Sequence, residues 1–261
     1  MPALQDLLSL VSGGVVGFML GLVVGGGSIL ALPLLIYVVG VSSIHEAIGT
    51  SAVAVAASAA ANLAGHAHAQ TVKWPCAIVF ALAGIVGAAG GAQLGKMTDG
   101  GHLLALFGAL MVAIGLLMLR RRRSEGNPDV QLTRETLHEL LPQLIGTGLA
   151  VGALSGFFGI GGGFLIVPGL MRATAMPLLN AIGSSLVSVT VFGLTTAVSY
   201  ALSGLVDWRV AILFILGGAV GGFGGIRLGR HLAAYKQGLS RTFAGIVTAV
   251  GLYVIVTALM H

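Results

Sequence analysis

Charged residues are scarce in this sequence. Only 8% of its 261 residues are Asp, Glu, Lys or Arg, whereas 56% are hydrophobic. A soluble domain has roughly 25% charged residues, so this chain lacks the polar surface that a soluble fold needs. The longest polar stretch, residues 120–143, is too short to form a folded core of its own. The low charge therefore excludes a soluble globular protein.

Cysteine is almost absent, because Cys76 is the only one. A single cysteine excludes an internal disulfide and a cysteine-lined metal cage, and we expect neither a cofactor nor a metal. The net charge of +5 does not indicate nucleic acid, because the basic residues gather at the ends of apolar runs, as they do in membrane proteins. The first apolar run has no basic residues before it, so we expect it to be retained rather than cleaved as a signal peptide.

Long apolar runs, in contrast, are abundant. Stretches of about 20 apolar residues recur from end to end, and each is long enough to cross ~30 Å of hydrocarbon as a helix. The sequence therefore predicts an all-α, polytopic membrane protein that is surrounded by lipid.

The chain repeats itself. Residues 17–33 read GFMLGLVVGGGSILALP and residues 152–168 read GALSGFFGIGGGFLIVP, with the glycines and the final proline aligned. The segment AIGTS at 47–51 likewise matches AIGSS at 181–185, and GAAGGAQLG at 87–95 matches GGFGGIRLG at 221–229. Because nearly the same offset in residue number aligns all three pairs of segments, the sequence predicts two copies of one unit. The predicted organisation is a single domain with a first membrane repeat at 1–123, a cytoplasmic linker at 124–142 and a second membrane repeat at 143–261.

Each repeat contains a glycine-broken element followed by three plain spans. The broken elements cover about 7–39 and 143–171, and the spans cover about 46–67, 75–95, 102–120, 178–203, 209–229 and 238–260. Basic clusters at 120–134 and 227–241 should both be cytoplasmic. They share a side only if the broken element is a re-entrant hairpin, and three crossings then invert the second repeat relative to the first. Residues 120–142, which comprise the linker and the basic end of the first repeat, would be cytoplasmic, and the C-terminus would be periplasmic. The alternative is eight simple spans.

The two glycine breaks carry the strongest functional signal. Consecutive glycines weaken a helix by roughly 1 kcal/mol each, and in hydrocarbon every freed backbone group needs a partner. The half-helix after each break presents free N–H groups and a positive dipole end, which suit an anion. The predicted site therefore includes Gly26, Gly27 and Ser28 from the first break and Gly161, Gly162 and Gly163 from the second. The alternative is that these glycines only permit close packing.

Hydroxyl and amide groups on the next spans can complete the shell around an oxyanion. They come one turn into each span and further along it, at Thr50, Ser51, Ser184, Ser185, Asn62, Thr196 and Tyr200. The alternative is that each bonds only the backbone of its own helix.

His66 and Glu46 are candidates for proton coupling, because histidine exchanges protons near neutral pH and intramembrane ionisable residues are usually functional. The alternative is an interfacial position without a special role. Glycines spaced every four residues, at 87–95 and 217–229, predict close helix packing, either within the chain or in a homodimer.

Taken in order, these motifs resemble the TauE/SafE family of sulfite and organosulfonate exporters. The resemblance covers about Leu10 to Leu259 and includes Pro33 and Pro168 after the two breaks. It implies a bacterial inner-membrane permease for small sulfur-containing anions and no enzymatic activity. One departure is Ser28, which stands where the second repeat has Gly163 and would make the two half-sites unequal.

The predicted function is a secondary transporter, an exporter of an anion such as sulfite or an organosulfonate that works by alternating access. Its partners would be the small anion, protons as coupling ion and membrane lipid, with no nucleic acid. An anion channel, or a carrier for another small organic anion, stays open as an alternative. An intramembrane enzyme is disfavoured, because the sequence has no nucleophile turn and no His-Glu-x-x-His motif.

Overall fold

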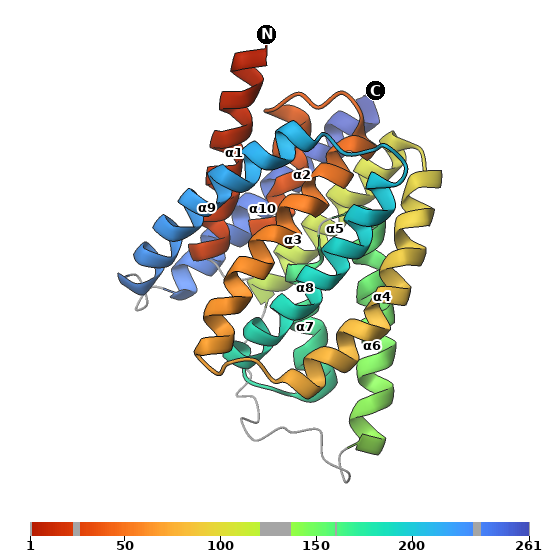
Figure 1. The fold of residues 1–261 in the computed structure, drawn as a ribbon, viewed down its shortest axis with the longest axis vertical. Coiled ribbons are helices and arrows are strands. Elements are labelled where there is room, and N and C mark those ends of the chain that lie inside the picture. The colour runs from red at the N-terminus through yellow and green to blue at the C-terminus, as the bar shows by residue number, and fades with distance from the viewer. Residues whose placement is uncertain (1, 23–26, 121–136, 160, 232–235, 261) are drawn as a thin grey trace.

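The computed structural model describes residues 2–22, 27–120, 137–159, 161–231 and 236–260 (Figure 1). Every regular element in these ranges is a helix. In chain order they are α1 (Pro2–Leu22), the short 3-10 helix η1 (Gly27–Leu30), α2 (Ala31–Tyr37), α3 (Ile44–His68), α4 (Trp74–Met97), α5 (Gly100–Arg120), α6 (Leu137–Phe158), α7 (Gly163–Thr174), α8 (Leu178–Ala201), α9 (Trp208–His231) and α10 (Lys236–Met260).

Six helices of the described ranges are long and apolar enough to cross a membrane, namely α3, α4, α5, α6, α8 and α9. The all-α, multi-pass prediction is therefore confirmed. In contrast, α2 has 7 residues and α7 has 12. At 1.5 Å per residue they extend only about 10 and 18 Å, which is too short to cross the bilayer. The helix α6 begins at Leu137 and so includes the last residues of the predicted linker.

The broken element of each repeat packs on a plain span of the other repeat. The helix α1 lies along α9, and α6 lies along α4 (Figure 1). Because α1 corresponds to α6 in the repeat and α9 corresponds to α4, these two contacts are equivalent. The pairs α3–α8 and α5–α10 join corresponding helices of the two repeats. The two repeats therefore exchange partners and form a single packed unit.

Glycines line both exchanged contacts. A methyl group at Gly17 would overlap the carbonyl oxygen of Gly218, and one at Gly152 would overlap that of Gly84. These two contacts lie at equivalent positions of the two repeats. The four-residue glycine stripes face the same seams, since a methyl group at Gly221 would overlap Gly14 on α1. The predicted packing role thus operates within the chain, and the stripes no longer support a homodimer.

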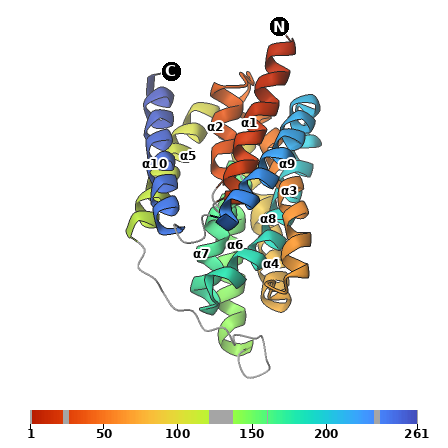
Figure 2. The same ribbon diagram turned by 90° about the vertical axis from the view of Figure 1, so that its left-hand side faces the viewer.

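The broken elements of the two repeats run in opposite directions. The two ends of the chain lie at the same end of the molecule, and α6 begins at the opposite end (Figures 1 and 2). The helix α1 therefore descends toward the middle of the molecule in these views, whereas α6 rises toward it. An inverted repeat requires these opposite directions.

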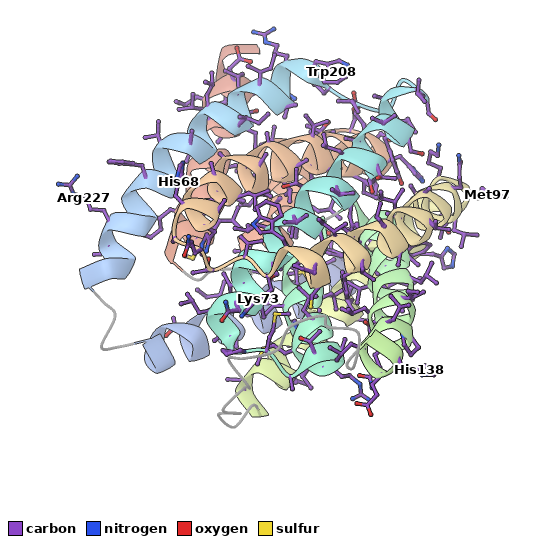
Figure 3. All side chains as sticks on the ribbon, turned by 60° about the horizontal axis from the view of Figure 1, so that its bottom comes forward. His68, Lys73, Met97, His138, Trp208 and Arg227 are labelled. Atoms are coloured by element: carbon purple, nitrogen blue, oxygen red, sulfur yellow. The ribbon has the colours of Figure 1, made fainter. Side chains whose placement is uncertain are left out.

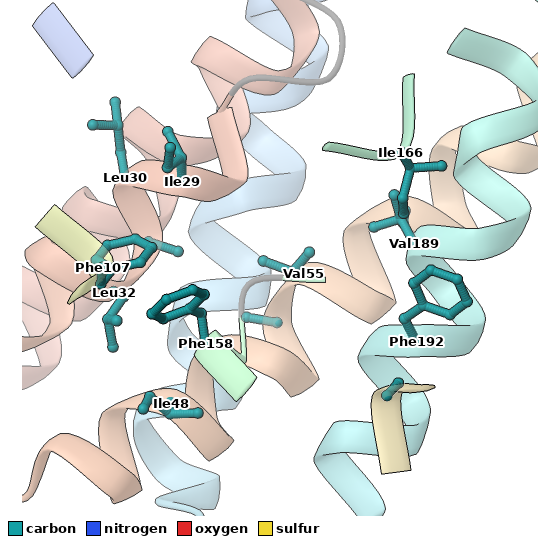
Figure 4. Packing of buried hydrophobic residues seen from close by; sticks show 14 of the residues in the cluster. Ile29, Leu30, Leu32, Ile48, Val55, Phe107, Phe158, Ile166, Val189 and Phe192 are labelled. Carbon is teal, nitrogen blue, oxygen red and sulfur yellow. The ribbon is translucent and has the colours of Figure 1, made fainter. Parts of the chain in front are cut away.

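The centre of the hydrophobic core lies around the breaks. Phe158, the last residue of α6, packs on Phe107 of α5 at 5.6 Å between ring centroids, and Leu32 lies nearby (Figure 4). Large apolar side chains also cover the outside, such as Val86 at 67% exposed and Val220 at 78%. Polar side chains such as His138 and Arg227 project from the periphery (Figure 3). An apolar exterior of this kind fits lipid rather than water.

Candidate functional site

The second break is a buried left-handed turn between α6 and α7. Gly159, Gly161 and Gly162 have φ values of +66°, +62° and +68°. Residues with a side chain rarely adopt this region, so glycine is required here. Gly162 is the N-cap of α7, and its carbonyl oxygen accepts hydrogen bonds from the backbone N–H groups of Leu165 and Ile166, both at 2.8 Å. The half-helix α7 therefore begins inside the protein.

Helix α3 of the first repeat holds this turn in place. A methyl group at Gly159 would overlap the Ile48 side chain, and one at Gly161 would lie 2.7 Å from Cγ1 of Val55. The Ser51 hydroxyl lies 2.9 Å from the carbonyl oxygen of Ile48 and 3.2 Å from that of Gly159, so it can donate to either. Ser51 and the second break, which were predicted to share a site, are therefore brought together across the two repeats.

A buried serine stands beside the start of α7. A methyl group at Gly162 would lie 2.9 Å from Oγ of Ser155. Ser155 is 0% exposed, and its hydroxyl has no hydrogen-bond partner among the described residues. A buried hydroxyl without a partner costs about 1–3 kcal/mol. The sequence prediction missed Ser155, because its counterpart in the first repeat is Leu20 and repeat symmetry did not select it.

The first break lies partly outside the described residues, which exclude Gly26. Gly27 begins η1, and Ser28 follows with a hydroxyl that is 1% exposed and has no partner in the described part of the chain. The short helix η1 contacts α7. The segments that follow the two breaks therefore contact each other within the core; Figure 2 shows α7 below α2.

Thr50 and Ser184 are tied to the loops before two spans. The Thr50 hydroxyl accepts a hydrogen bond from the backbone N–H of Asp207 at 3.0 Å, and the Ser184 hydroxyl accepts one from that of Lys73 at 2.9 Å. Asp207 directly precedes α9, and Lys73 is the N-cap of α4. The two bonds are equivalent by the repeat and cross between the repeats. Their geometry gives these hydroxyls a role in the fold.

We expect Thr50→Ala and Ser184→Ala each to lower the free energy of unfolding by about 1 kcal/mol, because each leaves a backbone N–H without its acceptor. Thermal unfolding in detergent measures this loss. Thr190→Ala is the matched control, because the Thr190 hydroxyl donates only to Leu186 of its own helix at 2.7 Å. A raised transport KM without loss of stability would contradict this role and return the two hydroxyls to the substrate.

The remaining predicted donors divide into two groups. Ser185 donates to Ile182 at 2.7 Å and Asn62 donates to Ser58 at 2.9 Å, so both bond the backbone of their own helices. Thr196 and Tyr200 are 0% exposed, and their hydroxyls have no partner within the described ranges. The Tyr200 hydroxyl points toward α4, where a methyl group at Gly95 would lie 3.1 Å from it.

The two proton-coupling candidates lie at opposite ends of α3. Glu46 is in the first turn, and His66 is in the last turn, where its Nδ1 lies 2.9 Å from the Thr71 hydroxyl. Their separation of 20 positions corresponds to about 30 Å of helix. Glu46 and His66 therefore cannot belong to one site.

Apart from Tyr200 and Cys76, the buried polar side chains of the described residues are serine and threonine, and none is a carboxylate or a basic group. The described residues also contain no group of three side chains that could hold a metal ion. A ligand at the breaks would thus be held by backbone N–H groups and hydroxyls. Both are hydrogen-bond donors, and together they favour an anion with several oxygens.

Spanning helices combined with half-helices that begin in the core define a multi-pass membrane transporter. A family model described as "Sulfite exporter TauE/SafE" matches residues 9–254. The chain belongs to this family.

Relatives support the same class. A "Probable membrane transporter protein" of Xylella fastidiosa (strain 9a5c) is 52% identical over 249 residues, which cover 95% of this chain and 94% of that protein. The "Probable membrane transporter protein YunE" of Bacillus subtilis (strain 168) is 28% identical, with 84% and 85% of the two chains covered. No solved structure matches the chain. The family and the relatives make this protein a membrane transporter rather than an enzyme.

Proposed function

We propose that this protein is a secondary transporter that exports a small sulfur-containing anion, such as sulfite or an organosulfonate, by alternating access. The anion would bind where the two breaks meet. The observation that carries the proposal is the start of α7 inside the core, where Gly162 lies beside the unpartnered Ser155 hydroxyl. The proposed contacts are backbone N–H groups and hydroxyls of Gly26, Gly27, Ser28, Ser51, Gly161, Gly162 and Gly163, with Ser185, Asn62, Thr196 and Tyr200 farther out.

The chemistry of these groups suits an oxyanion. The first N–H groups of a helix have no intrahelical acceptor, and the helix dipole adds a partial positive charge there. In a low-dielectric core these interactions are stronger than in water. The described residues of the site include no buried cation, so they would bind an anion moderately. A transporter needs moderate binding because it must also release its substrate.

Counterflow in proteoliposomes tests the proposal. Vesicles containing purified protein are preloaded with sulfite, sulfoacetate, taurine or thiosulfate, and entry of the labelled anion is followed. A carrier shows saturable uptake that the internal anion stimulates, whereas a channel shows no such stimulation. Uptake without trans-stimulation would indicate an anion channel instead of a carrier. Transport of only non-sulfur organic anions would contradict the proposed substrate class.

We propose His66 and Glu46 as separate candidates for proton coupling, and the same vesicles test His66. An imposed pH gradient should drive accumulation of the anion in the wild-type protein. His66→Gln should retain counterflow but lose this accumulation, because exchange of bound anion needs no net proton movement. Accumulation that is unchanged in His66→Gln would exclude His66 from coupling.

We further propose that the protein lies in the bacterial inner membrane with residues 120–142 in the cytoplasm and the C-terminus in the periplasm. The support is the charge bias together with the opposite directions of α1 and α6. Alkaline phosphatase fused after His261 should be active, and green fluorescent protein at the same place should be dark. The reverse pattern would place the C-terminus in the cytoplasm and overturn this orientation.

A further inference from the structure

The two repeats differ at one equivalent place. In the first repeat a depression lies between α1, α3 and α9, and Leu20, Ala54 and Ser58 are among its lining residues. The corresponding place in the second repeat lies between α6, α8 and α4. At the equivalent positions of the second repeat, Phe192 stands in place of Ser58, Ser155 in place of Leu20 and Ser188 in place of Ala54.

Phe192 occupies the place where the first repeat has the small side chain of Ser58. A methyl group at Gly84 would overlap the Phe192 ring, whereas at the equivalent Gly218 the nearest described atoms are the Gly13 carbonyl oxygen at 3.5 Å and Oγ of Ser58 at 3.7 Å. The Phe192 ring stacks on Phe80 with 6.2 Å between centroids (Figure 4 shows Phe192 one turn along α8 from Val189). The second repeat is therefore packed by an aromatic ring at a place where the first repeat has only a small side chain.

Two hydroxyls flank the filled place without partners. Ser155 and Ser188 are both 0% exposed, and neither hydroxyl has a hydrogen-bond partner in the ranges that the structure describes. The first repeat has apolar side chains at both positions and so carries no such cost. Two unsatisfied hydroxyls in an apolar core disfavour this state relative to one in which they gain partners.

We propose that Ser155 and Ser188 form a second oxyanion-binding subsite that Phe192 covers in this conformation. The inference rests on the proposed function and deepens it. In an inverted-repeat transporter the two repeats exchange conformations between inward-open and outward-open states. Movement of the Phe192 ring would uncover this place in the second repeat, and the two hydroxyls would then face the anion.

The subsite is continuous with the proposed anion site. Ser155 borders Gly162, so an oxyanion oxygen bound to its hydroxyl would lie next to the start of α7. Ser188 lies four residues before Phe192 on α8, so the two side chains share one face of that helix. An anion leaving the breaks toward α4 would thus meet both hydroxyls, and the ligand class is a small oxyanion such as a sulfonate.

Thiol labelling tests the cover. In a Cys76→Ser background, which removes the only native cysteine, Ser155→Cys is placed in proteoliposomes. It is treated with an anionic sulfonatoethyl or a cationic trimethylammonioethyl methanethiosulfonate. We expect slow labelling with Phe192 present, and Phe192→Ala should raise the rate about tenfold or more with preference for the anionic reagent. Phe107→Ala, an equal truncation elsewhere in the core, should leave the rate slow.

Transport by alanine variants is the second measurement. Ser155→Ala and Ser188→Ala should each raise the KM for a transported anion about tenfold with little change in the maximal rate, because each removes a hydrogen bond to a charged group. Ser12→Ala is the matched control, since Ser12 is 2% exposed, its hydroxyl also has no partner in the described part, and it lies on α1 away from Phe192.

The two measurements separate this inference from the proposed function. If the wild-type protein transports sulfur anions but the labelling rate ignores Phe192 and both KM values stay unchanged, the subsite is overturned and the function stands. If the wild-type protein transports none of the tested anions, the proposed function fails, and the labelling experiment alone tests the subsite. Preference for the anionic reagent after Phe192→Ala then supports the subsite, whereas equal rates or a cationic preference overturns it.

Discussion

Gly162→Val is expected to abolish anion transport while the protein remains folded. Gly162 has φ +68°, and a residue with a side chain pays about 1–2 kcal/mol in this region. Its Cβ would also lie 2.9 Å from both Cβ and Oγ of Ser155, so the start of α7 must move away from α6. Because the proposed site is built on that start, even a small shift removes the N–H groups from the anion. Initial rates in proteoliposomes measure the loss.

Gly204→Val is the matched control for Gly162→Val. Gly204 has φ +69°, but no described atom lies within 4 Å of a methyl group there. The variant therefore has the same backbone strain but no close contact at the new side chain, and we expect it to transport normally. Both variants are compared by gel filtration and thermal unfolding in detergent. If Gly162→Val itself does not fold, the smaller Gly162→Ala replaces it. Wild-type flux in a folded Gly162 variant would move the site away from the second break.

Gly91→Leu is expected to be the most destabilising single change in the seams between the repeats. A methyl group at Gly91 would overlap the carbonyl oxygen of Ala153 and lie 2.9 Å from the backbone nitrogen of Phe157. Backbone atoms cannot turn aside as a side chain does, so α4 and α6 must separate. We expect a loss of about 3 kcal/mol, the upper end for overpacking, together with a lower midpoint of thermal unfolding.

The neighbouring residue provides the control. Gly90 precedes Gly91 on the same helix, and no described atom lies within 4 Å of a methyl group there. Gly90→Leu should be neutral or stabilising, since leucine is a better helix former than glycine by about 1 kcal/mol. Equal unfolding midpoints for the two variants would mean that the α4–α6 contact does not hold the repeats together.

Much of the fold could be read along the chain. The spans are predicted well, because length and hydropathy belong to each segment alone; α3, predicted at 46–67, occupies 44–68. The glycine break before Gly163 is also predicted, because consecutive glycines disfavour helix wherever they occur. Ser51 was selected because it recurs in the repeat, and its hydroxyl reaches Gly159.

The candidate site was harder to predict, because it depends on which faces meet. Thr50 recurs in the repeat just as Ser51 does, yet its hydroxyl accepts from Asp207 at the start of α9. Adjacent residues on a helix point about 100° apart, and only the packing decides what each one faces. Ser155 does not recur at all, and its lack of a partner is a property of its surroundings.

By itself, the sequence determined that this is a helical membrane transporter with two similar repeats and two broken elements, because these features depend on local composition and spacing. Only the tertiary structure decided that α1 packs on α9 and α6 on α4. The same four-residue glycine spacing marks all four helices, with Gly13 and Gly17 on α1 matching Gly148 and Gly152 on α6. Either broken element therefore fits either striped span by pattern alone. The choice, and with it the filling of one repeat by Phe192, comes from how the whole set of helices packs at once.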